Sequence, residues 1–513
     1  MPKRRLWGAG AAAVLTTLFV LATPGVAGAQ DASEAVTTLG QQVNLLWIVI
    51  GAILVVFMQA GFALVETGFC RAKHAAHVVS TNFAIFGLGF VAFFLVGYAF
   101  MFGGYSYVLE GADFGYTRAI GEPLIKVGDW VFLWKGGFAL ADIGKAGGAA
   151  VLGFFFYMVA FMDTVATIPT GSMAERWKWK SFVGWGLFCG AIYYPLFGAW
   201  TWGGGWLSQL GNNVDLGLGY VDFAGSGVVH AMGGMAALSG ALILGPRIGK
   251  YGADGKPKTL PGHHIPMAML GVFILLFGWF GFNAASTLAA TDIQFATVAT
   301  NTAIAGAFGA TMGMFWIMMR AGKPDPGMMA NGMLAGLVAI TAPCAFVDPW
   351  AAAVIGIIAS VIVIEAIGFI ERRGIDDPVG AISVHGIGGL FGVLCVGIFS
   401  NGSYGAGWNL TEGVEGGVTG ILYGGSGAEQ LLVQAIAAVT IIVVGFGFSF
   451  LFWKLQNAIM KGGIRPSAED EMMGLDLPEM GALAYPEFTE LPADMGGEKG
   501  HVPEHAGTGS TMS

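Results

Sequence analysis

Hydrophobic residues along this chain gather into eleven long runs, and more polar segments separate one run from the next. Each run has roughly the length that an α-helix needs to cross about 30 Å of hydrocarbon. The runs fall at residues 43–66, 80–103, 147–173, 182–201, 224–245, 265–286, 296–319, 328–346, 350–370, 381–400 and 430–453. This pattern predicts an all-α polytopic membrane protein with eleven transmembrane helices.

The composition supports a membrane location. Hydrophobic residues make up 55% of the 513-residue chain and charged residues only 11%, against about 25% charged in an ordinary soluble domain. Glycine is abundant at 84 residues, and small residues let membrane helices approach closely. The four cysteines have no CxxC spacing, so we interpret them as small core residues. The net charge of -9 says little about partners, and nothing indicates binding to nucleic acid.

The N-terminus is predicted to be a signal peptide. Three basic residues at positions 3–5 precede an apolar stretch that ends in Ala-Gly-Ala at 27–29. This is the order of the basic, hydrophobic and cleavage regions of a secretory signal. Cleavage before Gln30 removes residues 1–29 and leaves 30–42 as an external N-terminal segment. An uncleaved additional helix is the alternative.

Basic residues orient the predicted helices. With the N-terminus outside, seventeen of the 24 Lys and Arg residues lie on the cytoplasmic side and four lie in one external loop, between the second and third runs. The remaining three belong to the signal peptide. This distribution obeys the positive-inside rule at every turn. We therefore expect an N-out, C-in protein in the cytoplasmic membrane, with a cytoplasmic C-terminal tail at 461–513.

One motif occurs twice. Residues 222–234 read DFAGSGVVHAMGG and residues 377–389 read DPVGAISVHGIGG, so His230 and His385 follow an aspartate by eight residues in both. The first motif opens the fifth run and the second opens the tenth, from opposite sides of the membrane. Five spans followed by five form an inverted repeat, covering about 43–245 and 265–400, with helix 430–453 left over. Such repeats place substrate sites near the midplane.

The two histidines are expected to meet at the membrane centre. Eight helical residues rise about 12 Å, so each imidazole approaches the midplane from its own side. Two unrelated histidines that pack helices through hydrogen bonds are the alternative, but ionisable groups inside a membrane usually mark a pathway. A metal site is disfavoured, because zinc and copper need three or four ligands. No cofactor and no metal are therefore expected.

Several motifs together resemble one family. They are FALVETGFCRAKH at 62–74, AER at 174–176, the motif around His230, GWFGFNAAS at 278–286 and DDPVGAISVHGIGGLFG at 376–392. This combination is similar to the ammonium transporter family (Amt/Mep/Rh), on the Amt side, from about residue 43 to about 475. The resemblance implies an eleven-helix membrane domain over 43–460, a pore in each protomer and a homotrimer.

The resemblance also implies roles for individual residues. Phe161, Trp202 and Ser286 match the outer recruitment site of the family, and Phe282 with Phe161 matches its gate. An aromatic face attracts a cation. Without the resemblance, however, Trp202 would be interpreted as a tryptophan at the membrane interface, and Phe282 as a residue that only packs between helices. The register of Phe161 is the least secure, because other aromatic residues crowd the same helix.

The two motif aspartates are expected to shape the site. Asp222 matches the buried aspartate of the family, and it starts a helix, so an N-cap role is at least as favoured as direct contact with an ion. Asp377 precedes Pro378 and is interpreted as structural in the same way.

The C-terminal tail carries a further resemblance. Residues 463–488, above all Gly474-Leu475-Asp476, are similar to the C-terminal segment of the family. This likeness implies contacts with neighbouring protomers and regulation by a trimeric PII-type signal protein. Residues 496–513 are polar and are expected to be disordered. No signalling domain is recognised in the sequence.

The predicted function is ammonium uptake. Ammonium is recruited outside, loses its proton and crosses as ammonia past His230 and His385, with methylammonium as an analogue and with separate proton passage. The alternatives are an ammonium sensor and an electroneutral gas channel; the intact Trp202 and Ser286 argue for recruitment of a cation. Nothing supplies a nucleophile with a base, so no enzyme is expected. The external loop at 104–144 has no function that the sequence reveals.

Overall fold

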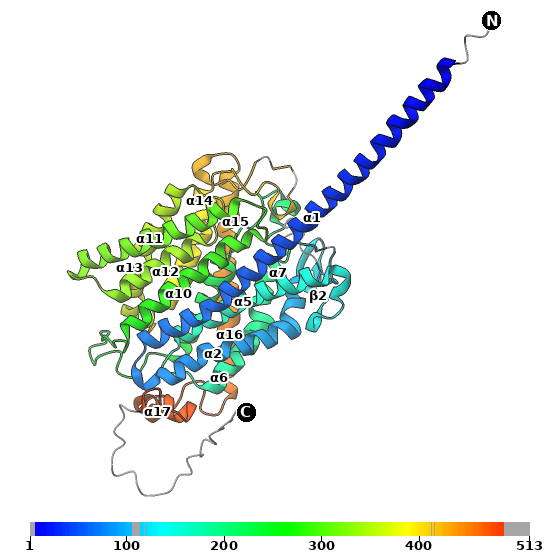
Figure 1. Cartoon of the computed structure of the whole chain (residues 1–513). Helices are drawn as coiled ribbons and strands as arrows, with labels where there is room; N and C mark the ends of the chain where they lie inside the picture. The colour runs from blue at the N-terminus through cyan, green and yellow to red at the C-terminus, as the bar shows by residue number, and fades with distance from the viewer. Residues whose placement is uncertain (1–5, 105–112, 117, 412, 415, 487–513) are drawn as a thin grey trace, which may run out of the picture.

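The computed structural model describes residues 6–104, 113–116, 118–411, 413–414 and 416–486, with the backbone alone for 6–32. Helices form one elongated bundle, from which the N-terminal part of α1 projects (Figure 1). The predicted disorder of 496–513 falls outside the described residues, as do the first five residues of the predicted signal peptide.

The first five apolar runs form helices, several of them with short π-helical or 3₁₀ turns (η). These elements are α1 (Leu6–Phe69), η1 (Ala72–His74), α2 (Ala75–Ala92), η2 (Phe93–Gly97), α3 (Tyr98–Phe102), α5 (Gly148–Ser172), α6 (Trp179–Phe188), η5 (Cys189–Tyr193), α7 (Tyr194–Trp200), η6 (Ser226–Ala231) and α9 (Met232–Leu244).

The remaining runs follow the same order. Their elements are α10 (Ile265–Asn283), η7 (Ala284–Thr287), α11 (Gln294–Ala321), α12 (Pro326–Ile340), α13 (Pro349–Arg372), η8 (Ile382–Ile387), α14 (Gly388–Phe399), α15 (Gly427–Thr440), η11 (Ile441–Gly445) and α16 (Phe446–Ile459). The connections and the tail add η3 (Phe138–Leu140), η4 (Ile143–Ala146), α8 (Leu210–Val214), η9 (Trp408–Leu410), η10 (Ile421–Tyr423), α17 (Ala468–Met473) and η12 (Asp476–Met480).

Ten helices within the described residues are long and apolar enough to cross a membrane, and α12 is a shorter apolar helix. The predicted run at 328–346 is therefore helical only as far as Ile340. Pro343 lies three residues beyond that end, and proline removes a backbone donor and disfavours helix in the residue before it. The freed carbonyls of Thr341 and Ala342 instead accept hydrogen bonds from the backbone of Ala224 and Phe223.

The long loop after α3 contains a β-hairpin. Strands β1 (Glu122–Val127) and β2 (Trp130–Lys135) pair antiparallel. The hairpin packs on the end of α7, since Trp134 Nε1 donates to Gly203 O at 2.7 Å and Trp206 N donates to Val131 O at 3.0 Å. The hairpin thus covers the same end of the bundle as the loop that carries Trp202.

A buried ion cluster ties loops together at the opposite end of the bundle. Arg247 donates three hydrogen bonds of 2.8–3.0 Å to the carboxylate of Asp376 and one of 3.0 Å to Glu175, which also accepts from Arg71 Nε at 2.6 Å. Burial acts to raise the pKa values of Glu175 and Asp376, but the neighbouring guanidinium groups outweigh it and lower both.

The segment after α16 docks on this same end. Glu471 accepts from Arg465 Nε at 2.8 Å and from Ile248 N at 2.7 Å. Asp476 accepts from His77 N at 2.9 Å, and Leu475 N donates to His74 Nδ1 at 3.2 Å. The described part of the tail, with α17 at this end of the bundle (Figure 1), therefore contacts its own membrane domain through Glu471, Leu475 and Asp476.

We predict that Asp376→Asn lowers the free energy of unfolding of the detergent-solubilised protein by about 3–5 kcal/mol. The substitution removes one of the two carboxylates that neutralise the buried guanidinium group of Arg247, and only Glu175 remains. Since folding lowers the pKa values of both carboxylates, their stabilisation is present above about pH 4, the usual range of unfolded carboxylates, and is lost as the pH falls through the lower folded values. Thermal unfolding between pH 7 and pH 3 measures both effects.

The exposed Lys256–Asp254 pair, 3.7 Å apart, provides the control. Asp254→Asn should change stability by less than about 1 kcal/mol. Equal melting temperatures for Asp376→Asn and the wild type would show that the buried cluster does not stabilise the fold.

Candidate functional site

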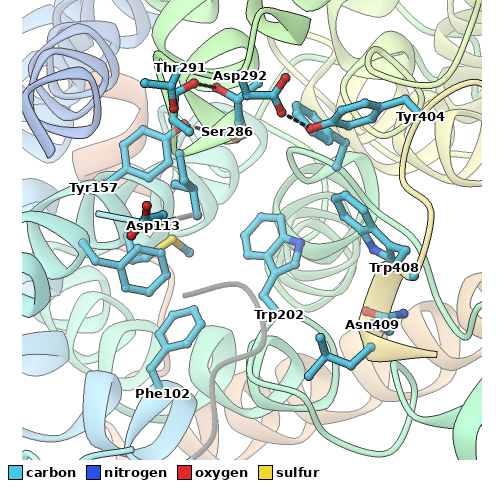
Figure 2. A pocket seen from close by; sticks show the side chains of 18 of the residues that line it. Phe102, Asp113, Tyr157, Trp202, Ser286, Thr291, Asp292, Tyr404, Trp408 and Asn409 are labelled. Atoms are coloured by element: carbon cyan, nitrogen blue, oxygen red, sulfur yellow. Dashed lines mark hydrogen bonds between the residues drawn. The ribbon is translucent and has the colours of Figure 1, made fainter. Parts of the chain in front are cut away.

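A pocket of about 400 Å³ opens at the hairpin end of the bundle. Aromatic residues from several elements line it, together with Ser286 and two carboxylates, Asp113 and Asp292 (Figure 2). The three residues predicted for the outer recruitment site, Phe161, Trp202 and Ser286, all line this pocket. The pocket is much larger than a small cation, so it admits a hydrated one.

Trp202 lines the pocket and is held in place by its indole N–H. Its Nε1 donates to the backbone oxygen of Asp222 at 2.8 Å, and its ring lies 5.9 Å from that of Phe161 at 79°. The indole N–H is therefore already satisfied. The ring faces remain as the part of Trp202 that a cation can use.

Ser286 is positioned by a residue that the sequence analysis missed. Ser286 Oγ donates to Phe282 O at 2.8 Å and lies 3.1 Å from the hydroxyl of Tyr157. Tyr157 lies one turn before Phe161 on α5, and that spacing is the signal that places both on one face.

Two phenylalanine rings close the bottom of the pocket. Phe161 and Phe282 stack with centroids 4.1 Å apart and an interplanar angle of 22°, and both are fully buried. The two rings come from α5 and α10, one from each half of the chain. Passage below the pocket therefore requires at least one ring to move.

The two motif histidines meet directly beyond these rings. His230 lies 5.4 Å from Phe282 between ring centroids, and its Nδ1 is 3.1 Å from Nδ1 of His385. The imidazoles are nearly parallel at 20°. One Nδ1 donates and the other accepts, so the two rings carry different tautomers and form a continuous hydrogen-bonded unit.

Trp279 forms a wall beside His230. Its ring lies 5.2 Å from the imidazole at 19°, and its Nε1 donates to Thr341 Oγ1 at 2.9 Å. Sequence reasoning did not single it out, although it lies inside the quoted motif at 278–286 and one turn before Phe282. Apart from the imidazole nitrogens, the surroundings of the pair are thus largely apolar.

Each histidine lies on a π-helical turn with an aspartate at its start. Asp222 accepts from the backbone N–H groups of Gly225, Gly227 and Val228 at 2.8–2.9 Å. Asp377 accepts from those of Ala381 and Ile382. These carboxylates satisfy the free donors at the helix starts. Burial raises the pKa of Asp377 to about 6, although these donors oppose it.

Two glycines just after the π-helical turns, Gly234 on α9 and Gly389 on α14, let each histidine-bearing segment touch the other. A Cβ atom at Gly234 would collide with the backbone of Gly386, and one at Gly389 would lie 2.5 Å from Ser226 O. Because only the hydrogen atom of glycine fits at these positions, the backbones of the two halves are in direct contact where they cross. This close contact is what brings the Nδ1 atoms within hydrogen-bonding distance.

The rim of the pocket contains polar residues that the sequence analysis did not identify. Tyr404 donates to Asp292 at 2.5 Å, and Trp408 and Asn409 line the pocket beside them (Figure 2). They come from the connections after η7 and α14, whose loop sequences carry no recognisable motif. Across the described residues, no group of three His, Cys, Asp or Glu side chains is arranged to hold a metal ion.

Taken together, the aromatic pocket, the stacked rings and the histidine pair lie in series between the two halves of a helical membrane bundle. A pathway between two halves of a helical membrane bundle is typical of polytopic membrane transport proteins. The Ammonium Transporter Family matches residues 46–485. The chain belongs to this family.

Individual relatives agree with this assignment. Ammonium transporter Amt2 of Archaeoglobus fulgidus is 44% identical over 94% of this chain and 97% of its own length. A putative ammonium transporter of Synechocystis is 33% identical, and the match covers 91% of this chain and 94% of that relative. Among solved structures, a Sensor Amt Protein superposes with a TM-score of 0.74 at 34% identity, over 86% of this chain and 99% of its own. The structure of Mep2 of Saccharomyces cerevisiae superposes with a TM-score of 0.68 at 25% sequence identity, and the match covers 83% of this chain and 88% of that protein.

Membership confirms the resemblance stated from the motifs and the predicted fold class of a helical, multi-pass membrane protein. It also agrees with the expectation that the chain is a transporter and not an enzyme.

We predict that Gly234→Ala reduces transport of methylammonium at least tenfold, because its methyl group pushes the two histidine-bearing segments apart. Uptake of labelled methylammonium into proteoliposomes measures the loss. Gly447→Ala is the control, since no atom lies within 4 Å of a Cβ there, and it should transport at the wild-type rate. Full activity of Gly234→Ala would show that the histidine contact tolerates separation.

Proposed function

We propose that the chain takes up ammonium across the cytoplasmic membrane by separating the ion into ammonia and a proton. The observation that carries this proposal is the contact between Nδ1 of His230 and Nδ1 of His385 at 3.1 Å, directly beyond the stacked rings of Phe161 and Phe282. A hydrogen-bonded pair of imidazoles in an apolar passage suits a neutral amine and a mobile proton.

Recruitment takes place in the outer pocket. The face of Trp202, the ring of Phe161 and the hydroxyl of Ser286 line it, and an aromatic face stabilises a desolvated cation by about 2 kcal/mol. The hydroxyl oxygen of Ser286 accepts an N–H bond from the ion. The backbone carbonyl of Asp222 holds Trp202 in place, so Asp222 acts on the site by positioning, as Asp377 does in the other half.

Deprotonation is the less costly route through the pore. A bare cation moved into a low-dielectric interior costs tens of kcal/mol by Born estimates. An amine that titrates near pH 10 gives up its proton at pH 7 for about 4 kcal/mol. The difference favours ammonia as the species that passes Phe161, Phe282 and the imidazoles.

The histidine pair offers a path for the proton. Each imidazole donates through one nitrogen and accepts through the other, so a proton taken up at one end of the pair is released at the other. If ammonia and the proton both cross, net transport carries one positive charge per ammonium. Potassium has no proton to lose and is therefore excluded despite its similar size.

Sensing and electroneutral gas conduction are the rival functions. The similarity to a Sensor Amt Protein concerns the fold as a whole, and most of the other relatives are named transporters. A pocket lined by aromatic rings, a hydroxyl and carboxylates favours a cation over a neutral gas.

The proposal extends to assembly and topology. The protein works as a homotrimer with its N-terminus outside after removal of the signal peptide and its C-terminus in the cytoplasm. The docking of the tail through Glu471 and Asp476 gives a PII-type signal protein a surface through which to act on the membrane domain.

We expect proteoliposomes on a solid-supported membrane to give a saturable inward current after an ammonium jump at constant pH, and none after a potassium jump. Substitution of His230 or His385 by alanine should reduce this current at least tenfold, because the proton path is broken. His264→Asn is the control, since His264 is exposed and only caps α10, a role that asparagine fills. If the folded wild-type protein gives no current after the ammonium jump, transport of a net charge is refuted.

We also expect Trp202→Leu to raise the half-saturating ammonium concentration about tenfold or more, in line with the loss of about 1.4–2 kcal/mol of cation–π stabilisation. The current amplitude at saturation should change less. Trp350→Leu tests the alternative role of an interfacial tryptophan, because Trp350 is half-exposed at the start of α13. Identical effects of both substitutions would remove Trp202 from the recruitment site.

A further inference from the structure

Glu66 is a carboxylate that the proposed mechanism leaves unused. It lies within the membrane-crossing part of α1 and is only 3% exposed. Asn82 Nδ2 lies 2.6 Å from its Oε2, and Thr170 Oγ1 lies 2.8 Å from both carboxylate oxygens. Neither neighbour is charged, and within the described residues no ion pair involves Glu66. An ionisable group kept in a membrane without a counter-ion usually marks a pathway.

The hydrogen bonds around Glu66 suit both of its protonation states. When the carboxylate is ionised, the hydroxyl of Thr170 donates to it. When it is protonated, its O–H donates to Thr170 Oγ1, which then donates to the backbone oxygen of Thr167 at 2.5 Å. Asn82 donates to the carboxyl oxygen in either state. No buried donor or acceptor is left unsatisfied when the proton comes or goes.

A small cavity joins Glu66 to the histidine pair. Glu66 and His385 both line it, with Phe62, Leu334 and Asn331 among the other residues. Its volume of about 20 Å³ is enough for one water molecule, which needs about 10–15 Å³ and two or more polar partners. His385, Glu66 and Asn331 supply those partners. Nδ1 of His385 faces His230, so its other nitrogen, Nε2, is free to serve this cavity.

We propose that Glu66 receives the proton that leaves the histidine pair and releases it toward the end of the bundle that carries the Arg247 ion cluster. This inference rests on the proposed separation of ammonia and proton. Water in the cavity takes a proton from His385 Nε2 and gives one to a Glu66 oxygen. On release the carboxyl O–H bond breaks, solvent water at that end of the bundle accepts the proton, and Glu66 returns to the ionised form.

The position of Glu66 along α1 supports this direction. Arg71, in the ion cluster with Glu175, follows Glu66 by five residues and lies just beyond the end of α1 at Phe69. Phe62, one turn on the other side, has its ring 6.2 Å from that of His385. Glu66 thus lies between the histidines and the charged end of the bundle.

The neutral surroundings leave the proton free to move. The titratable groups nearest to Glu66 on the surrounding segments are Cys70 just after α1, His77 on α2, Asp163 on α5, Asp377 before η8 and His385 on η8. The apolar stretches of α10 and α12 that line the cavity, around Leu275 and Leu334, contribute none. With no fixed cation beside it, Glu66 is not locked in the ionised form.

A purely structural role is the competing explanation, in which Glu66 only ties α1 to α2 and α5. Glutamine has nearly the same shape, and its amide oxygen accepts from Asn82 and Thr170 equally well, but it does not exchange a proton. Glu66→Gln therefore separates the two explanations.

The test uses the full-length protein in proteoliposomes on a solid-supported membrane, with a fluorescent pH indicator inside the vesicles. We expect Glu66→Gln to reduce the ammonium current at least tenfold. Ammonia should still enter the vesicles without its proton, so the vesicle interior should become alkaline. Glu66→Asp keeps a carboxylate and should retain part of the current. Glu365→Gln is the matched control, because Glu365 bonds Trp316 and Arg320 on the outer side of α11 and α13, away from the pathway.

The outcomes separate the two proposals. A wild-type current that Glu66→Gln leaves intact overturns the role of Glu66 and leaves the histidine mechanism standing. If the wild-type protein gives no ammonium current, both the role of Glu66 and the proposed separation of ammonia and proton are overturned.

Thr170→Val provides a second readout, which remains useful if Glu66→Gln does not fold. It removes a hydroxyl that stabilises the ionised carboxylate, so Glu66 holds its proton more tightly. The pH at which the current is half-maximal should then move upward relative to the wild type. An unchanged pH profile with a normal current would contradict proton transfer through Glu66.

Discussion

The close backbone contact between the two histidine-bearing segments is the constraint on which the rest of the site depends. Gly234 against Gly386, and Gly389 against Ser226, leave no room for a side chain where the halves cross. The aspartate at the start of each π-helical turn fixes its register, so the imidazoles arrive facing each other. The stacked phenylalanine rings and Trp279 then pack against an arrangement that the glycines have already set.

The distribution of charge follows from the same need for a dry centre. Strong ion pairs, such as Arg247 with Asp376, lie at one end of the bundle, and carboxylates such as Asp292 lie in the pocket at the other. Between these ends the proposed pathway is built from aromatic rings, two imidazoles and the Glu66 carboxylate, which is held by neutral donors. A fixed charge there would bind a cation or repel a proton, and either would stop turnover. The contacts of the described tail, such as those of Glu471 and Asp476, lie at the charged end.

Much of this architecture was predictable from the sequence because hydrophobic length and the repeated motif report on it directly. Ten apolar runs became long helices, and the equal spacing of His230 and His385 from their aspartates anticipated their meeting. The early end of α12 was not predicted, because an apolar run continues past Pro343 and hides the break. Tyr157 and Trp279 were missed because their roles depend on rotamers and on neighbours from distant helices. Glu66 was visible inside the quoted motif at 62–74, but only the packed structure shows that it shares a cavity with His385.

The stack of Phe161 on Phe282 has a consequence for speed. Because the two rings touch, the path from pocket to histidines is closed at rest, and each molecule that crosses must wait for a ring to swing aside in a tightly packed interior. In the proposed mechanism, throughput is then set by how often thermal motion displaces a ring, not by diffusion through an open tube. Such a protein works at the pace of a transporter with a steep dependence on temperature, even though no domain of it needs to rock.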